Sequence, residues 1–271
     1  LVPQDGNTGL VGGGVPRDGE LVLSLAGLDR VGEVDPAAAQ VSVGAGVTLE
    51  RVQEIARRAG LQFPLDFPAR TSATVGGSIA TDAGGALALR HGTMRRRVVG
   101  LEFVLADGSV VSRMDGLLKD NAGLDLPALL IGSEGTLGVI TAARLQLERA
   151  AGPRLAALFG LAGLDQALAL LTRLRAVAGL EAVDFFDAAC MRLVSEARGL
   201  RDPLGGEHEL YVIAQLEGEG DLAAELADAL DPLPFDPDVA VAESTTDCER
   251  LWAFRELINE SIRELGVPHK L

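Results

Sequence analysis

The first 150 residues show short hydrophobic runs separated by turn residues, a pattern that predicts strands. Residues 21–25 and 41–43 are two such runs, and Asp35-Pro36 between them favours a turn. Residues 101–105 alternate and lead into Asp107-Gly108, a pair typical of a type I′ hairpin turn, before the chain returns through 110–111. This region is therefore expected to contain several short strands and at least one hairpin.

One amphipathic helix interrupts these strands. Thr48 is a suitable N-cap residue and Gly60 a suitable terminator, so the helix is predicted to lie between them. Its apolar residues recur with helical spacing on one stripe: Leu49, Val52, Ile55, Ala56 and Ala59. Such a stripe indicates a structural helix that packs on a sheet.

After about residue 147 the pattern changes to longer segments in which strands alternate with helices. The predicted strands are 155–161, 181–186, 209–216 and 238–241, and the predicted helices are 165–177, 188–197, 221–230 and 246–265. This order favours a sheet covered by helices. Pro153 lies where the pattern of predicted strands and helices changes, so we expect two domains, 1–150 and 151–271.

Composition narrows the class of protein. The net charge of -15 argues against nucleic acid as a partner, because counterion release requires a basic face. The two cysteines, Cys190 and Cys248, fit neither a metal spacing nor a disulfide framework and are expected to be buried free thiols. No secretory signal or apolar run of membrane-spanning length is visible, which predicts a cytoplasmic protein.

Two glycine-rich runs carry the candidate chemistry. Residues 1–14 and 76–85 cannot form ordinary helices, and their glycines allow positive φ angles and close approach of a ligand to the main chain. Successive N–H groups in such turns form concave anion sites that suit a phosphate or pyrophosphate. Neither the P-loop pattern nor the G-x-G-x-x-G pattern is present, so a dinucleotide cradle of another kind is indicated, with a plain glycine-rich turn as the alternative.

Six segments resemble one known family. They are PQDGNTGLVGGGVP at 3–16, FPLD at 63–66, TVGGSIATDAGG at 74–85, LEFVLADGSVV at 101–111, LLKDNAGLDL at 117–126 and IGSEGTLGVIT at 131–141. Together they resemble FAD-linked oxidoreductases of the vanillyl-alcohol oxidase and p-cresol methylhydroxylase superfamily, in the D-2-hydroxyglutarate and D-lactate dehydrogenase branch. The resemblance implies an α+β fold, with an FAD-binding domain of the p-cresol methylhydroxylase type followed by a ferredoxin-like substrate or cap domain. Both domains are expected to be incomplete, because the family has residues before Leu1 and beyond Leu271.

The resemblance also implies which residues contact FAD. They are Pro3, Gln4, Gly6, Asn7, Thr8, Gly9, Leu10, Pro64, Leu65, Asp66, Ser72, Gly76, Gly77, Ser78, Thr81, Asp82, Gly84, Gly85, Glu134, Gly135, Gly138, Val139 and Ile140. Three positions depart from the family pattern: Asp5 replaces a glycine, and Ser78 and Asp82 replace asparagines. Asp5 places a negative charge near an anion, which is expected to weaken FAD binding.

A second set of residues is implied to bind the substrate. Residues 252–259, WAFRELIN, resemble the family segment whose arginine holds the substrate carboxylate, and that arginine matches Arg255. An arginine suits this role because its fork can engage both carboxylate oxygens. Lys270 matches a family lysine, whereas Asn259 stands where the hydroxyglutarate branch has threonine, which leaves the substrate open.

The implied reaction is oxidation of a D-2-hydroxy acid, of the 2-hydroxyglutarate or lactate class, by hydride transfer to flavin N5. The protein would bind a small 2-hydroxy acid and pass electrons to an acceptor such as a quinone, an electron-transfer flavoprotein or a cytochrome, and a homodimer is left open. The family's catalytic base and its zinc-like divalent metal ligands would lie beyond Leu271, so this chain alone is expected to be inactive. The alternatives are a non-catalytic flavin-binding or structural subunit of a larger oxidoreductase complex and, less favoured, an enolpyruvyl reductase of the same cofactor fold.

Overall fold

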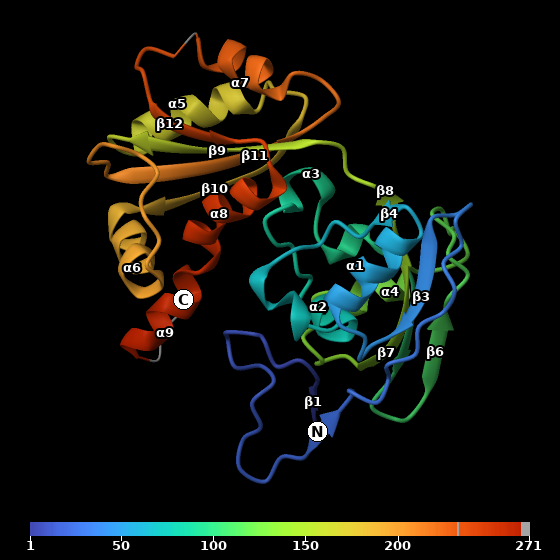
Figure 1. The fold of residues 1–271 in the computed structure, drawn as a ribbon. Helices are drawn as coiled ribbons and strands as arrows, with labels where there is room; N and C mark the ends of the chain where they lie inside the picture. Colours follow the sequence, from blue (N-terminus) through green and yellow to red (C-terminus); the bar gives the residue numbers. More distant parts are fainter. Residues whose placement is uncertain (232, 267–271) are drawn as a thin grey trace. The chain divides into compact units, whose positions relative to one another are not determined.

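The computed structural model describes residues 1–231 and 233–266, and Figure 1 shows its ribbon. The chain divides into two compact units: unit 1 comprises residues 1–150, and unit 2 begins at Ala151. Each unit has its own sheet and its own core. Among the described residues, no helix combines the length and the apolar character that a membrane crossing requires.

Unit 1 is organised around a four-stranded antiparallel sheet. In spatial order its strands are β3 (Gln40–Gly44), β7 (Val139–Gln146), β5 (Val98–Val104) and β6 (Val110–Arg113). Two smaller pairs accompany it: β1 (Val2–Gln4) with β2 (Val22–Ser24), which are parallel, and β4 (Leu61–Gln62) with β8 (Glu148–Arg149), which are antiparallel. β1 lies within the first glycine-rich run, and β2 follows that run along the chain.

The helices of unit 1 are short apart from the first. They are α1 (Leu49–Arg58), α2 (Val75–Ala80), α3 (Ala88–His91) and α4 (Leu126–Leu130), with 3-10 turns η1 (Pro68–Thr71) and η2 (Met94–Arg96). The predicted caps of α1 are observed: the Thr48 hydroxyl accepts the backbone N–H of Arg51, and Gly60 takes a φ of 71°. Leu49, Val52 and Ala56 are fully buried on one side of the helix.

Alternation along β3 fixes the core of unit 1. Val41 and Val43 are buried, whereas Ser42 between them is partly exposed, as expected for a strand with one buried face. Their core cluster includes Leu49 of α1 and Ile79 of α2. The prediction that the second glycine-rich run forms no helix was wrong for residues 76–80, which lie in α2 behind the N-cap Thr74, and this packing holds them beside the sheet.

The predicted hairpin is present, but its turn type was wrong. β5 pairs with β6 through Val104 and Val110, and Leu105 donates its backbone N–H to the carbonyl of Ser109. A type I′ turn needs positive φ at both central residues, yet of Asp107 and Gly108 only Gly108 has one, at 86°. Asp107 instead accepts the N–H of Ser109, which favours a longer turn.

Unit 2 contains a four-stranded antiparallel sheet in the order β10 (Leu180–Asp187), β11 (Leu210–Glu217), β9 (Arg154–Leu161) and β12 (Asp238–Ala242). Its helices are α5 (Leu164–Leu174), α6 (Ala188–Arg198), α7 (Leu222–Leu230), α8 (Thr245–Glu256) and α9 (Ile258–Leu265). With α5 joining β9 to β10 and α7 joining β11 to β12, this is the ferredoxin-like strand order, and the predicted α+β class is confirmed. The helix α6 is an addition between the second and third strands.

The two faces of this sheet differ. Leu155, Phe159 and Val212 share a core cluster with residues of α5 and α7, so those two helices cover one face. The opposite face carries α8, whose Cys248 and Trp252 are buried (Figure 1). Cys248 confirms the prediction of a buried free thiol, whereas Cys190 is only partly buried.

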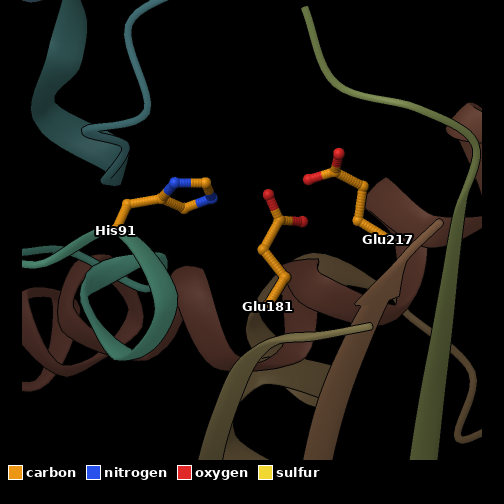
Figure 2. Close-up of side chains that lie close together, drawn as sticks. All are labelled: His91, Glu181 and Glu217. Atoms are coloured by element: carbon orange, nitrogen blue, oxygen red, sulfur yellow. The ribbon is translucent and has the colours of Figure 1, made fainter. Parts of the chain in front are cut away.

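Polar residues interrupt the apolar face that α8 covers. Glu181 is fully buried, and its two carboxylate oxygens lie 2.8 and 2.6 Å from Nε and Nη2 of Arg154. Gln215 of the adjacent strand donates a further hydrogen bond of 2.7 Å to Glu181. Figure 2 shows Glu181 together with Glu217, which extends from β11 and accepts the backbone N–H of Gly152. Glu181 lies at the register irregularity between Leu180 and Ala182.

The single long helix predicted for 246–265 is instead two helices. Ser244 caps α8 by accepting the N–H of Asp247, and α8 ends at Glu256. Leu257 has a φ of -82° and a ψ of -3°, and α9 then continues from Ile258. Leu257 still donates its N–H to the carbonyl of Ala253 and accepts the N–H of Ser261, so the break is a small departure of one residue from helical geometry that the apolar pattern of the sequence does not mark.

Candidate cofactor and substrate sites

A groove of about 490 Å³ lies between the two glycine-rich runs of unit 1. Its lining residues come from the loop after β1, from the segment around α2 and from one turn before β7. They are Pro3, Gln4, Asp5, Gly6, Asn7, Thr8, Gly9, Leu10, Val11, Gly13, Gly14, Phe67, Ala73, Thr74, Gly77, Ser78, Ala80, Thr81, Ala83, Gly84, Gly85 and Glu134. The two runs singled out in the sequence thus form one wall each of a single groove.

The loop of the first run is held by contacts that only glycine permits. A Cβ on Gly6 would lie 2.0 Å from the carbonyl oxygen of Ser72, so the loop and the segment before α2 touch backbone to backbone. Asn7 has a φ of 47°, a left-handed conformation that asparagine tolerates better than most residues. Gln4 closes the loop by donating a 2.5 Å hydrogen bond to the carbonyl of Gly14.

A smaller cavity of about 70 Å³ adjoins the same residues. Its glycines also have close neighbours: a Cβ on Gly76 would lie 2.7 Å from the Cβ of Ala45. Gly135 takes a φ of 78°, and Glu134 before it has a φ of 50°, which makes the tight turn predicted from the sequence. The lining residues are Pro3, Gln4, Asp5, Leu25, Gly76, Gly77, Ala80, Glu134, Gly135, Gly138, Val139 and Ile140.

Most of the residues implied to contact a cofactor line one of these two cavities, and five do not. Leu65 belongs to the core with no exposed surface, and Pro64 beside it is also buried. The Asp66 carboxylate pairs with Arg70 at 3.1 Å, whereas Asp82 accepts the N–H of Arg95. Ser72 lines neither cavity, but its carbonyl oxygen packs against Gly6 and so supports the loop that does.

Apart from Asp5, eight groove residues were not among the expected FAD contacts: Val11, Gly13, Gly14, Phe67, Ala73, Thr74, Ala80 and Ala83. Thr74 is the N-cap of α2, and its hydroxyl accepts the N–H of Gly77, so a threonine followed by Val-Gly-Gly was the available signal. Ala73 and Phe67 also line the groove, and no local pattern marks them.

Three buried side-chain oxygens near these cavities have no hydrogen-bond partner within the described residues: Asp5 Oδ2, Ser78 Oγ and Ser133 Oγ. Buried polar atoms are rarely left unpaired, so each points to a missing partner. Ser78 and Asp5 line the 490 Å³ groove. No lysine, arginine or histidine is among its lining residues, so an anion there would be held by backbone N–H groups and hydroxyls.

His91 lies outside the lining of both cavities. It is buried, and its Nδ1 lies 2.7 Å from a carboxylate oxygen of Glu148 (its ring is drawn in Figure 2). Arg97 pairs with the other oxygen of the same carboxylate and donates to the carbonyl of His91 at 2.7 Å. This cluster ties η2 and α3 to β8.

Unit 2 contains two of the three residues implied to bind a substrate. Arg255 lies in the last turn of α8, where its Nε is 2.7 Å from Oδ2 of Asp184 on β10. Its side chain is 34% exposed, so the guanidinium remains reachable by a solute. Asn259 is exposed on α9, beyond the break at Leu257, and Lys270 lies outside the described residues.

Comparison with known families gives the class of the protein. The "FAD binding domain" family matches residues 1–113, and the "FAD linked oxidases, C-terminal domain" family matches residues 153–270. The chain therefore belongs to the FAD-linked oxidoreductases of the vanillyl-alcohol oxidase and p-cresol methylhydroxylase superfamily. The resemblance carried by the six sequence segments is confirmed.

Individual relatives are more specific. The chain is 38% identical over 276 residues to the mitochondrial D-2-hydroxyglutarate dehydrogenase of Bos taurus, covering 99% of this chain and 50% of that protein. It is 36% identical over 275 residues to the D-2-hydroxyglutarate dehydrogenase of Xanthomonas citri pv. viticola, covering 100% and 58%. A solved structure of alkyldihydroxyacetonephosphate synthase matches 99% of this chain and 51% of its own, with a TM-score of 0.74 at 18% identity, and shares the fold. The chain thus spans about half the length of the relatives that it matches.

The prediction of a cytoplasmic location is wrong by this comparison. The relatives from Bos taurus, Danio rerio and Rattus norvegicus are all named as mitochondrial proteins. The prediction rested only on composition and on a leader not being visible, and neither feature of these residues encodes a compartment.

The groove of unit 1 fits an FAD, with Asp5 as an exception. Because the loop residues in contact are glycines, main-chain atoms line the surface of the groove. The Ser78 hydroxyl, which has no partner within the described residues, can form a hydrogen bond with a ligand. Asp5 instead presents a buried carboxylate oxygen with no partner to a groove that would hold the negatively charged pyrophosphate of FAD. Burial raises the pKa of the Asp5 carboxyl, and a hydrogen bond with the Thr74 side chain offsets part of that rise.

We expect Asp5→Asn to bind FAD about tenfold more tightly than the parent at pH 8, because it removes a charge that repels the pyrophosphate. The parent's affinity should fall as the pH rises through the raised pKa of Asp5, since only the deprotonated carboxyl is charged, and the variant's affinity should vary less. Fluorescence titration of FAD into the apoprotein from pH 5 to 8 measures both. Asp18→Asn is the control, because it makes the same change in net charge at an exposed residue outside the groove lining. Equal pH profiles for the parent and Asp5→Asn would contradict the role of Asp5.

Proposed function

We propose that the chain supplies the FAD-binding and carboxylate-binding parts of a dehydrogenase that oxidises a D-2-hydroxy acid, of the 2-hydroxyglutarate or lactate class, to the 2-oxo acid. When bound, FAD supplies a two-electron acceptor for the hydrogen on the substrate's Cα. The names of the relatives support the substrate class. The observation that carries the proposal is Arg255, a partly exposed arginine in the "FAD linked oxidases, C-terminal domain" region of the chain.

The roles of the residues follow from their chemistry. Arg255 binds a substrate carboxylate, because its planar fork matches the two carboxylate oxygens. We assign Lys270 as a second cation that binds the substrate. We assign Asn259 as an uncharged contact that helps to select the length of the substrate. Pro3, Gln4, Gly6, Gly77 and Ser78 belong to the wall that holds the cofactor.

Two parts of the reaction lie beyond these assignments. Oxidation of the hydroxyl carbon also releases the hydroxyl proton, so the complete site needs a base, and we name none among the described residues. The electrons then pass to a second acceptor, for which a quinone, an electron-transfer flavoprotein or a cytochrome is chemically suited.

The test is anaerobic flavin reduction. A version of the protein that spans the full length of its relatives, loaded with FAD, should lose its flavin absorbance on addition of D-2-hydroxyglutarate or D-lactate, and the faster of the two identifies the substrate class. L-2-hydroxyglutarate is the control, since a stereospecific site should leave the flavin oxidised. A protein that binds FAD but is reduced by neither acid would favour the alternative of a flavin-binding subunit.

A further inference from the structure

The guanidinium of Arg255 contacts a carboxylate through Nε, whereas its two terminal nitrogens are available to a ligand. Asp184 Oδ2 lies 2.7 Å from Nε, so the ion pair forms at the inner edge of the guanidinium. Within the described residues, the two terminal nitrogens Nη1 and Nη2 have no ion-pair or hydrogen-bond partner. The Asp184 side chain is itself 30% exposed, so the pair is neither fully buried nor freely solvated.

Asp184 is held more firmly than a surface carboxylate. It lies within β10, where its Cα pairs with that of Ile213 on β11, and its Oδ1 accepts the backbone N–H of Phe185 at 2.8 Å. The strand therefore fixes the carboxylate, and the carboxylate contacts a residue of α8. A rigid strand that supports a side chain on a helix is a favourable arrangement for precise placement.

This placement restricts how Arg255 can bind an anion. A guanidinium can meet a carboxylate along the Nε and Nη2 edge or end-on through Nη1 and Nη2. Because Asp184 occupies the Nε edge, only the end-on geometry is left. The charge of Asp184 also offsets that of Arg255, so the open fork would select a planar carboxylate by its geometry more than by net charge.

We propose that Asp184 is a positioning residue for Arg255, which it fixes so that Nη1 and Nη2 engage one substrate carboxylate end-on. This inference rests on the proposed function, because it assumes that Arg255 binds the substrate. It assigns to Asp184 a role in affinity without a role in the chemical step.

The experiment compares Asp184→Ala, Asp184→Asn, Arg255→Ala and the double variant in an FAD-loaded protein that spans the full length of its relatives. We expect Asp184→Ala to raise KM for the D-2-hydroxy acid about tenfold with kcat nearly unchanged, because the guanidinium loses its fixed orientation, and this loss outweighs the attraction gained by removing the Asp184 charge. Asp184→Asn keeps an oxygen acceptor and should recover part of the loss. In the Arg255→Ala background, the Asp184→Ala change should add nothing, because its target is gone.

Two controls exclude general damage. Glu207→Ala removes an exposed carboxylate of the same unit, away from the Asp184–Arg255 pair, and should leave KM unchanged. The fluorescence of Trp252, the only tryptophan, reports the packing of α8 and should be the same in all variants. If the increases in KM caused by Asp184→Ala and Arg255→Ala multiply in the double variant, the two residues act independently, and the positioning role is overturned.

Calorimetric titration with glutarate separates this inference from the proposed function. If the parent binds glutarate but oxidises no hydroxy acid, the proposed reaction fails, while a tenfold weaker Kd in Asp184→Ala still supports the positioning role. If Arg255→Ala weakens glutarate binding and Asp184→Ala does not, the positioning role fails alone. If neither variant changes Kd, both assignments fail.

Discussion

Glu181→Ala is expected to destabilise unit 2 by about 1–3 kcal/mol, the cost of leaving buried donors without their acceptor, because the Arg154 side chain is 34% exposed and water can solvate part of its charge. Glu181 has no exposed surface and accepts from both Arg154 and Gln215, so its removal leaves a guanidinium and an amide without their partner. Urea unfolding followed by Trp252 fluorescence measures the change, because that residue is buried in the same unit.

The matched control for this prediction is Arg250→Ala. Arg250 pairs with Asp247 at 2.9 Å on the surface of α8, with 72% and 53% of the two side chains exposed. Exposed pairs contribute about 0–1 kcal/mol, so the unfolding free energy should hardly change. A similar small effect for Glu181→Ala would show that water reaches the Glu181 site.

A second variant tests the cause of the loss. Replacing both partners, Arg154→Met with Glu181→Leu, removes the unpaired charge and should recover much of the stability, because apolar groups of similar volume can replace a buried pair. If the double variant is as unstable as Glu181→Ala, the loss comes from packing around β10 and not from the charge.

The fold was largely predictable because its elements follow local rules. The strands and helices of unit 2 were placed from their periodicity, and Thr48 with Gly60 bounded α1 as expected. Where prediction failed, the deciding feature was backbone geometry that residue types do not encode uniquely. The interruption at Leu257 and the single positive φ in the 105–109 turn are examples.

The candidate sites were predictable only in part, for a different reason. Glycine-rich runs are visible in the sequence, and most of their residues line the groove. The pairing of Asp184 with Arg255, in contrast, joins residues far apart in the chain through the β10 and α8 packing. No local pattern marks such a contact, so only the fold reveals which acid lies beside which arginine.

The second large effect is expected for Gly6→Ala, which should lower FAD affinity about ten- to hundredfold. The added Cβ would lie 2.0 Å from the Ser72 carbonyl oxygen and 2.9 Å from its carbon, so the loop must move away from the segment before α2. Overpacking against backbone costs about 1–3 kcal/mol or more, because neither side can turn aside as a side-chain end could.

Gly9→Ala is the matched control for this substitution, since it lies in the same loop but its Cβ would meet nothing within 4 Å. In the apoprotein, limited proteolysis of the loop should be faster for Gly6→Ala and unchanged for Gly9→Ala, which tests the loop contact without the cofactor. FAD titration of Gly6→Ala then tests the groove itself, with Gly27→Ala as the control, because Gly9 lines the groove whereas Gly27 lies outside its lining and its Cβ would also meet nothing within 4 Å. Tight FAD binding by Gly6→Ala would mean that the loop can leave Ser72 without losing the cofactor, and the groove between the two glycine-rich runs would no longer be the cofactor site.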